Sequence, residues 1–143
     1  MDADDRLDIL NVMSLYGHVI DARAWDRVHE VVTDDAEFDS SALGPGGGGS
    51  RAGLENVVAF WRTAPHPPAH HFANAYIYEE DGEVRSLSKW FIADGHGGIF
   101  GGDYQDVWRK TDAGWRIRKR VITGRHGLDT FFERLAASED PGS

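Results

Sequence analysis

The stretch IFGGDYQDVWRKTDAGWRIRKRVITG, residues 99–124, decides the fold class of this 143-residue chain. Its two halves, Ile99–Thr111 and Trp115–Gly124, are rich in β-branched and aromatic residues and flank a short turn, which is typical of a β-hairpin. Just before it, His70–Glu80 and Glu83–Ala93 flank a second turn, Asp81-Gly82. The second half of the chain is therefore expected to contain four antiparallel strands in series.

Helical spacing dominates the first half of the chain. Apolar residues three and four positions apart predict a long helix over Asp5–Asp21, a shorter one from Trp25 to Val32, and a third from about Gly53 to Thr63. A short strand is expected at Ala36–Ser40, and it leads into a glycine-rich loop at 44–50, for which we expect a flexible surface connector. Helices followed by a meander indicate an α+β fold with three helices on one face of a curved antiparallel sheet.

The length and patterning favour one domain over residues 1–143. A short closing helix is expected at Leu128–Ala137, and the polar end, 138–143, is expected to fray.

Composition narrows the function classes. The formal net charge is −9, with 24 acidic against 15 basic residues, so the chain would repel a phosphate backbone and nucleic acid is not an expected partner. Cysteine is absent, which excludes thiolate chemistry. No apolar run approaches the roughly 20 residues that span a bilayer, and the acidic start has no signal-peptide character. We expect a cytoplasmic protein with no membrane partner.

Five short segments carry a resemblance to a known family: YGHVIDARAW at Tyr16–Trp25, TDDAEFD at Thr33–Asp39, HHFAN at His70–Asn74, GDYQD at Gly102–Asp106 and GWRIRKR at Gly114–Arg120. With the order of the elements, they resemble the SnoaL-like branch of the nuclear-transport-factor-2-like superfamily, whose cystatin-like fold is cone-shaped. The resemblance extends from Asp5 to Arg125 and leaves the glycine loop unmatched.

The resemblance implies a small-molecule pocket in the open end of the cone. Scytalone dehydratase and hexachlorocyclohexane dehydrochlorinase, enzymes of this fold, use an Asp-His dyad, and Asp21 matches their aspartate. His70 matches the histidine if Asn74 is aligned with the asparagine of the dehydrochlorinase, whereas a shift of one residue selects His71. Arg120 matches an arginine that helps to hold the leaving group. Other expected pocket residues are Tyr16, Phe38, Trp61, Phe72, Asn74, Tyr76 and Tyr104.

Strand alternation constrains these assignments. Phe72, Asn74 and Tyr76 share parity with His70, so they are expected to line the pocket if His70 does, while His71 faces the other way. Arg120 presents a difficulty, because alternation from the core residue Trp115 places it outside unless a β-bulge changes the register.

The chemistry that such a dyad permits is general acid–base catalysis. A buried carboxylate that accepts the ring N–H of a histidine fixes the tautomer and leaves the second ring nitrogen as a base. Proton abstraction in an apolar pocket then supports a dehydratase, dehydrohalogenase, cyclase or isomerase reaction on a small, largely apolar cyclic metabolite, with no cofactor.

Other interpretations stay open at this stage. Asp21 suits a plain helix cap. His66, His70 and His71 form a histidine cluster, but a proline-rich loop gives His66 no fixed position, so no metal is expected.

A non-catalytic small-molecule-binding or subunit-assembly module of the same fold is the alternative function. It predicts a filled cone and an apolar outer sheet face. The resemblance also implies a homodimer formed through that face, with Trp90 and Trp108 as candidate contacts.

Overall fold

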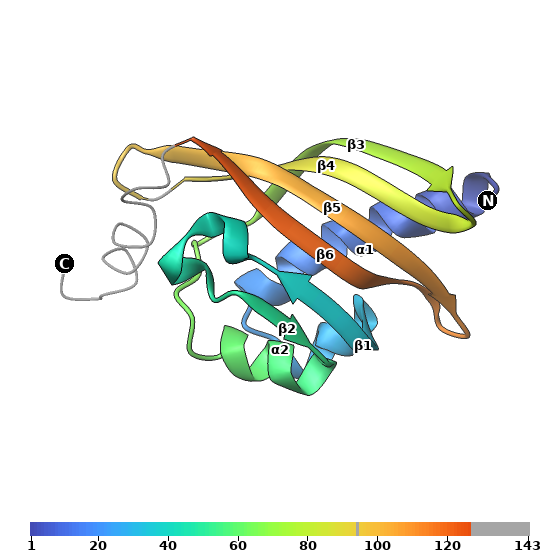
Figure 1. Ribbon diagram of the computed structural model, residues 1–143, viewed down its shortest axis with the longest axis horizontal. Coiled ribbons are helices and arrows are strands. Elements are labelled where there is room, and N and C mark those ends of the chain that lie inside the picture. Colours follow the sequence, from blue (N-terminus) through green and yellow to red (C-terminus); the bar gives the residue numbers. More distant parts are fainter. Residues whose placement is uncertain (94, 127–143) are drawn as a thin grey trace.

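The computed structural model describes residues 1–93 and 95–126 and confirms the expected α+β architecture (Figure 1). Six strands form one sheet in the order β2-β1-β6-β5-β4-β3. The pairing is antiparallel except between β1 and β6, which run parallel. The expected closing helix at Leu128–Ala137 and the tail at 138–143 lie outside the described residues.

The strands follow the expected hairpins closely. They are β1 (Val32–Asp39), β2 (Ser50–Ala52), β3 (His71–Glu80), β4 (Glu83–Ala93), β5 (Ile99–Thr111) and β6 (Gly114–His126). The sequence analysis missed β2, whose three residues are too few for an alternation pattern, and it started β1 four residues late. Neither parallel pairing nor strand order is encoded in local periodicity, so both came only from the structure.

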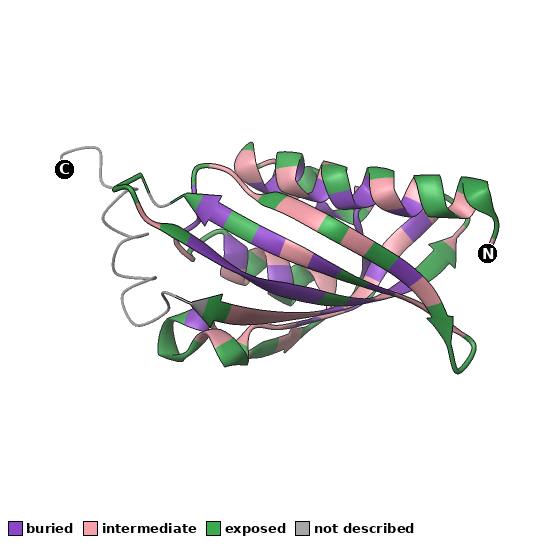
Figure 2. Ribbon diagram, turned by 90° about the horizontal axis from the view of Figure 1, so that it is seen from above, coloured by how far each residue is buried: buried purple, intermediate pink, exposed green. Residues whose placement is uncertain are grey.

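The helices are α1 (Ala3–Asp21), a 3₁₀ helix η1 (Trp25–Glu30) and α2 (Leu54–Trp61). The predicted second helix is thus a 3₁₀ turn, because six residues from Trp25 to Glu30 are too few for a stable α-helix and only Val28 among them is buried. α1, η1 and α2 share one buried apolar cluster with the inner sheet face, which includes Ile9, Val57 and Ile117. Buried and exposed residues alternate along the strands, because only one face of the sheet packs against this cluster (Figure 2).

The glycine-rich loop is folded rather than a loose connector. It forms two 3₁₀ turns, η2 (Ser41–Leu43) and η3 (Pro45–Gly47), and the Ser40 hydroxyl donates to the carbonyl oxygens of Gly47 and Gly49. A Cβ added at Gly48, where φ is +84°, would lie 2.2 Å from the Phe60 ring. The glycines therefore permit close packing against α2, which composition alone did not indicate.

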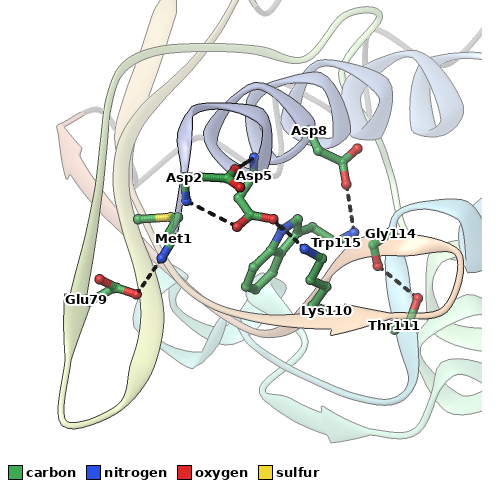
Figure 3. Close-up of polar contacts among 9 residues, drawn as sticks. All are labelled: Met1, Asp2, Asp5, Asp8, Glu79, Lys110, Thr111, Gly114 and Trp115. Carbon is green, nitrogen blue, oxygen red and sulfur yellow. Dashed lines mark hydrogen bonds and ion pairs between the residues drawn. The ribbon is translucent and has the colours of Figure 1, made fainter.

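The N-terminal end of α1 is fixed to the β5–β6 hairpin (Figure 3). Asp5 Oδ1 accepts from Lys110 Nζ at 2.7 Å and from Trp115 Nε1 at 2.8 Å, and Asp8 Oδ2 accepts from the Trp115 backbone N–H at 2.9 Å. The hydrogen bonds from Lys110 and Trp115 hold the pKa of the Asp5 carboxyl well below its usual range. Asp21 ends the same helix, so these contacts help to set where its carboxylate lies against the sheet.

None of the helices within residues 1–93 and 95–126 is long and apolar enough to cross a membrane.

Candidate active site

Asp21 and His70 meet where the C-terminal end of α1 lies against the start of β3. The Asp21 Oδ1 to His70 Nδ1 distance is 2.5 Å, and the His70 backbone N–H donates to both carboxylate oxygens at 3.0 and 3.1 Å. One carboxylate thus holds both the ring and the backbone of the histidine. With its proton on Nδ1, the His70 ring keeps Nε2 as the basic nitrogen.

The dyad is partly shielded from solvent. The side chain of His70 is 14% exposed and that of Asp21 is 25% exposed. Burial alone would raise the pKa of the Asp21 carboxyl, but the hydrogen bonds from the His70 ring and backbone, with the charge of the ring, lower it below the usual value. Asp21 therefore stays ionised over a wide pH range and can stabilise an imidazolium at His70.

Gly17 permits this close approach of helix and strand. A Cβ at residue 17 would lie 3.1 Å from the His70 carbonyl oxygen and 3.7 Å from its Cβ. The absence of a side chain on α1 therefore lets residue 70 sit directly against the helix, one turn before Asp21.

Two cavities adjoin His70. The α1-side cavity, about 240 Å³, is lined by Met13, Ser14, Tyr16, Gly17, His18, His70, His71, Phe72, Phe91, Tyr104 and Arg120. The loop-side cavity, about 110 Å³, is lined by Tyr16, Ser40, Leu43, Gly46, Gly47, Phe60, Trp61, Ala64, Pro65, His66, His70, Trp90, Ile92, Tyr104 and Ile122. Tyr16, His70 and Tyr104 contribute to both. His70 can therefore reach a ligand from either side.

Arg120 lies inside the cone because β6 contains a bulge. Trp108 pairs with Ile117 but Val107 pairs with Lys119, so Arg118 is the extra residue that shifts the register. The side chains of Arg120 and Asp106 are 1% and 0% exposed. Arg120 Nε and Nη2 donate to Asp106 Oδ1 and Oδ2 at 2.7 and 2.8 Å, a bidentate pair. The bulge required for an inward Arg120 is thus present.

Two tyrosine rings contact the Arg120 guanidinium, with their planes at 76° to each other and their centroids 6.3 Å apart. Its Cζ lies 4.3 Å from the ring centroid of Tyr16 and 3.9 Å from that of Tyr104. Burial raises the pKa of both phenols above 10.0, although the Arg120 charge acts in the opposite direction. Both hydroxyls therefore remain protonated donors near neutral pH. Further back, Phe38 stacks on Tyr16 and meets the Trp61 ring edge-on, with centroids 6.4 and 5.1 Å apart.

Of the three β3 residues expected to line the pocket beside His70, only Phe72 does so. Phe72 lines the α1-side cavity as expected. Asn74 and Tyr76 do not share its side: a bulge between Ala73 and Tyr76 changes the register, Asn74 takes a positive φ of 53° and is exposed, and Tyr76 is 63% exposed. The parity rule failed here because the strand is not regular over its length.

His71 differs from His70 as alternation predicts. Its side chain is exposed and stacks on Phe91 with a centroid distance of 5.0 Å, although the residue borders the α1-side cavity. His66 is buried, its Nε2 lies 2.8 Å from the Trp61 carbonyl oxygen, and its ring is 6.0 Å from that of His70. Across the described part of the chain, no three His, Asp or Glu side chains are arranged to hold a metal ion.

The expected outer-face tryptophans are in fact internal. Trp90 and Trp108 are each 4% exposed, and Trp90 borders the loop-side cavity. Sequence analysis also missed Asp106 as the partner of Arg120, because the bulge hides their cross-strand pairing, and it assigned no wall residues to the glycine-rich loop.

Comparison with known proteins places the chain in a family. The family model described as a SnoaL-like domain matches residues 1–121. A protein of unknown function with a cystatin-like fold from Nostoc punctiforme superposes with a TM-score of 0.76 at 16% identity, covering 90% of this chain and 97% of that one. No curated protein matches the chain.

Two named structures share the fold. ActVI-ORFA from Streptomyces coelicolor gives a TM-score of 0.70 at 18% identity, over 85% of this chain and 98% of its own. A hexachlorocyclohexane dehydrochlorinase, LinA type 2, gives a TM-score of 0.68 at 16% identity, and the superposition covers 86% of each chain. The TM-scores show a common fold, and at 16% and 18% identity the similarity extends to the fold alone.

Proposed function

The chain belongs to the SnoaL-like domain family, and on that basis we propose that it is a cofactor-independent lyase or isomerase for a small, largely apolar cyclic metabolite. The observation that carries the proposal is the 2.5 Å contact between Asp21 and His70 beside two cavities. In the proposed reaction, His70 Nε2 removes a proton from an acidic carbon, and Asp21 stabilises the resulting imidazolium. The dehydrochlorinase fold relative is consistent with such chemistry.

The proposal gives each of these residues a role. Asp21 and His70 form the acid–base pair, and His71, whose ring is outside and stacked on Phe91, has no part in it. Tyr16, Tyr104 and Arg120 form the polar wall against which the substrate lies, while Trp61 and Phe72 supply apolar contact area. Burial of Arg120, Tyr16 and Tyr104 strengthens the hydrogen bonds made at this wall.

Hydrogen–deuterium exchange tests the proposal without knowledge of the natural product. A panel of cyclic ketones and hydroxylated or halogenated rings is incubated with the protein in D₂O, and loss of C–H signal or formation of product is followed by NMR. Asp21→Asn and His70→Asn are expected to abolish protein-dependent exchange or turnover, while His29→Asn, at an exposed histidine that lines neither cavity, retains it. Equal rates in His70→Asn and wild type would refute the dyad.

We further propose that the protein forms a homodimer through the outer sheet face. Tyr76, Leu87 and Phe91, 63%, 38% and 42% exposed, belong to β3 and β4, and Leu87 and Phe91 alternate with buried residues. Tyr76 pairs directly with Leu87 across the two strands. Exposed apolar side chains on one face are typical of a protein–protein contact. Sedimentation equilibrium should give a dimer that Leu87→Glu dissociates, and a monomeric wild type contradicts it.

A further inference from the structure

We infer that Arg51 holds the β1–β2 connection, residues 40–49, closed over the loop-side cavity and so limits the size of the ligand that reaches His70. The inference goes beyond the proposed function, because it concerns access to the cavity rather than the reaction in it. Its starting point is the Phe60 ring, which lines this cavity. The Arg51 guanidinium lies over that ring, with its Cζ 3.5 Å from the ring centroid.

The β1–β2 connection forms part of the cavity wall. It contains the glycine-rich loop and joins the end of β1 to the start of β2 (Figure 1). Leu43, Gly46 and Gly47 line the loop-side cavity. Leu43 also packs against the second apolar cluster of the sheet, which consists of Trp90, Ile92, Phe100 and Tyr104. Movement of the connection away from these residues would therefore enlarge and open the cavity.

Arg51 joins the connection to α2. Its Nη1 donates a hydrogen bond to the Gly48 carbonyl oxygen while the guanidinium stacks on Phe60. Gly48 also packs directly against that ring, since a Cβ at residue 48 would lie 2.2 Å from the Phe60 Cζ. The hydrogen bonds of the Ser40 hydroxyl, by contrast, join residues of the connection to one another. Loss of Arg51 would therefore weaken the attachment to α2 and leave the connection itself folded.

The connection is suited to move as a unit. Gly44, Gly48 and Gly49 have φ values of +86°, +84° and +71°, a region that glycine enters at little cost. Of residues 40–49, only Gly47 is buried. A segment that buries few side chains opens at a much lower free-energy cost than the whole domain. One side-chain contact can therefore change the open fraction substantially.

The volume of the closed cavity makes this opening consequential. The loop-side cavity is about 110 Å³ with the connection in place, against roughly 300 to 1,000 Å³ for typical small-molecule sites. An apolar cavity of about 150 Å³ can accept benzene, so this one has room for a single small ring at most. A ligand with two fused rings requires the open form. Its apparent affinity is then reduced by the fraction of molecules that are open.

Thiol modification measures the opening. The chain contains no cysteine, so Ile92→Cys introduces a single thiol at a buried position that lines the loop-side cavity. Its rate of reaction with methyl methanethiosulfonate reports the open fraction when opening and closing are fast. Arg51→Met keeps the apolar stem but removes the stacked charge and the donor, so it should raise this rate about tenfold.

The matched control is Arg62→Met, at an exposed arginine directly after α2, and it should leave the rate of thiol modification unchanged. Gly48→Ala disturbs the contact with Phe60 from the side of the connection and should raise the rate as Arg51→Met does. Equal rates in Arg51→Met and in the parent Ile92→Cys protein overturn the inference.

Amide hydrogen exchange follows the same opening without an added cysteine. The Gly47 N–H donates to the Gly44 carbonyl oxygen at 2.9 Å, and its exchange should become faster in Arg51→Met. Amides paired between β5 and β6 should keep their protection. Faster exchange throughout the sheet would show general destabilisation and contradict a local opening.

Ligand size completes the test. Phenol and 2-naphthol are titrated into the wild-type protein and Arg51→Met, and binding is followed by NMR at the methyl groups of Leu43 and Ile92. The affinity for 2-naphthol should rise by about the same factor as the thiol rate, while that for phenol stays constant. No gain for 2-naphthol, or an equal gain for phenol, contradicts selection by size. Asp21→Asn should alter neither affinity, so failure of the proposed dyad leaves this result standing.

Discussion

Replacement of Asp106 by asparagine should strongly destabilise the fold. The side chains of Asp106 and Arg120 are 0% and 1% exposed and share two hydrogen bonds of 2.7 and 2.8 Å. Asparagine keeps the shape and loses the charge, which leaves a buried guanidinium uncompensated. Breaking such a pair costs about 3 to 5 kcal/mol. That cost is a large fraction of the roughly 5 to 15 kcal/mol by which small domains are stable.

The double variant Asp106→Leu with Arg120→Met supplies the matched comparison. Replacing both partners by apolar residues removes the charges together, and the expected change in unfolding free energy is close to zero. Urea denaturation followed by tryptophan fluorescence gives both values, provided that the slope with denaturant is unchanged. A cost below about 1 kcal/mol for Asp106→Asn, or a double variant as unstable as the single one, would refute the buried-pair interpretation.

Three further predictions concern the dyad and the glycine loop. Gly17→Ala places a Cβ 3.1 Å from the His70 carbonyl oxygen, so it should displace the histidine and slow dyad-dependent deuterium exchange by about tenfold. The pKa of Asp21 is lower in the folded protein than in the unfolded chain, so the unfolded state binds more protons in acid. Wild type should therefore be more stable than Asp21→Asn near neutral pH, and this difference in unfolding free energy should shrink below about pH 4. Urea titrations at several pH values measure it. Gly49 has a φ of +71° and open space around it, so Gly49→Ala should lower the unfolding free energy by about 1 kcal/mol in urea denaturation. Gly48→Ala should lower it more, because the added Cβ would also lie 2.2 Å from the Phe60 ring. Equal losses in the two variants would contradict the packed loop.

The periodic spacing of apolar residues in the sequence predicted most of the fold. The 3.6-residue spacing over α1 and the alternation on either side of Asp81-Gly82 and Asp112-Ala113-Gly114 predicted elements close to those observed, because amphipathic faces must meet one core. Local sequence patterns could not predict the short strand β2 or the parallel pairing of β1 with β6, because both depend on contacts between residues distant in sequence.

The site was predictable where it depended on resemblance and unpredictable where it depended on bulges. Asp21 and His70 meet as expected. The bulge at Arg118 in β6 changes the alternation of side chains and turns Arg120 inward. The irregularity after Ala73 in β3 has the opposite effect and turns Tyr76 outward. A bulge leaves no reliable sequence signal, since any residue type can occupy it.

The tautomer of His70 is the most direct test of the dyad. ¹⁵N NMR of the neutral form of the imidazole should show a protonated Nδ1, coupled to a strongly deshielded proton because of the 2.5 Å contact with Asp21, and an unprotonated Nε2. Asp21→Asn should remove the deshielded proton. A wild-type spectrum with the proton on Nε2 would contradict the assignment of Nε2 as the base, and with it the proposed reaction.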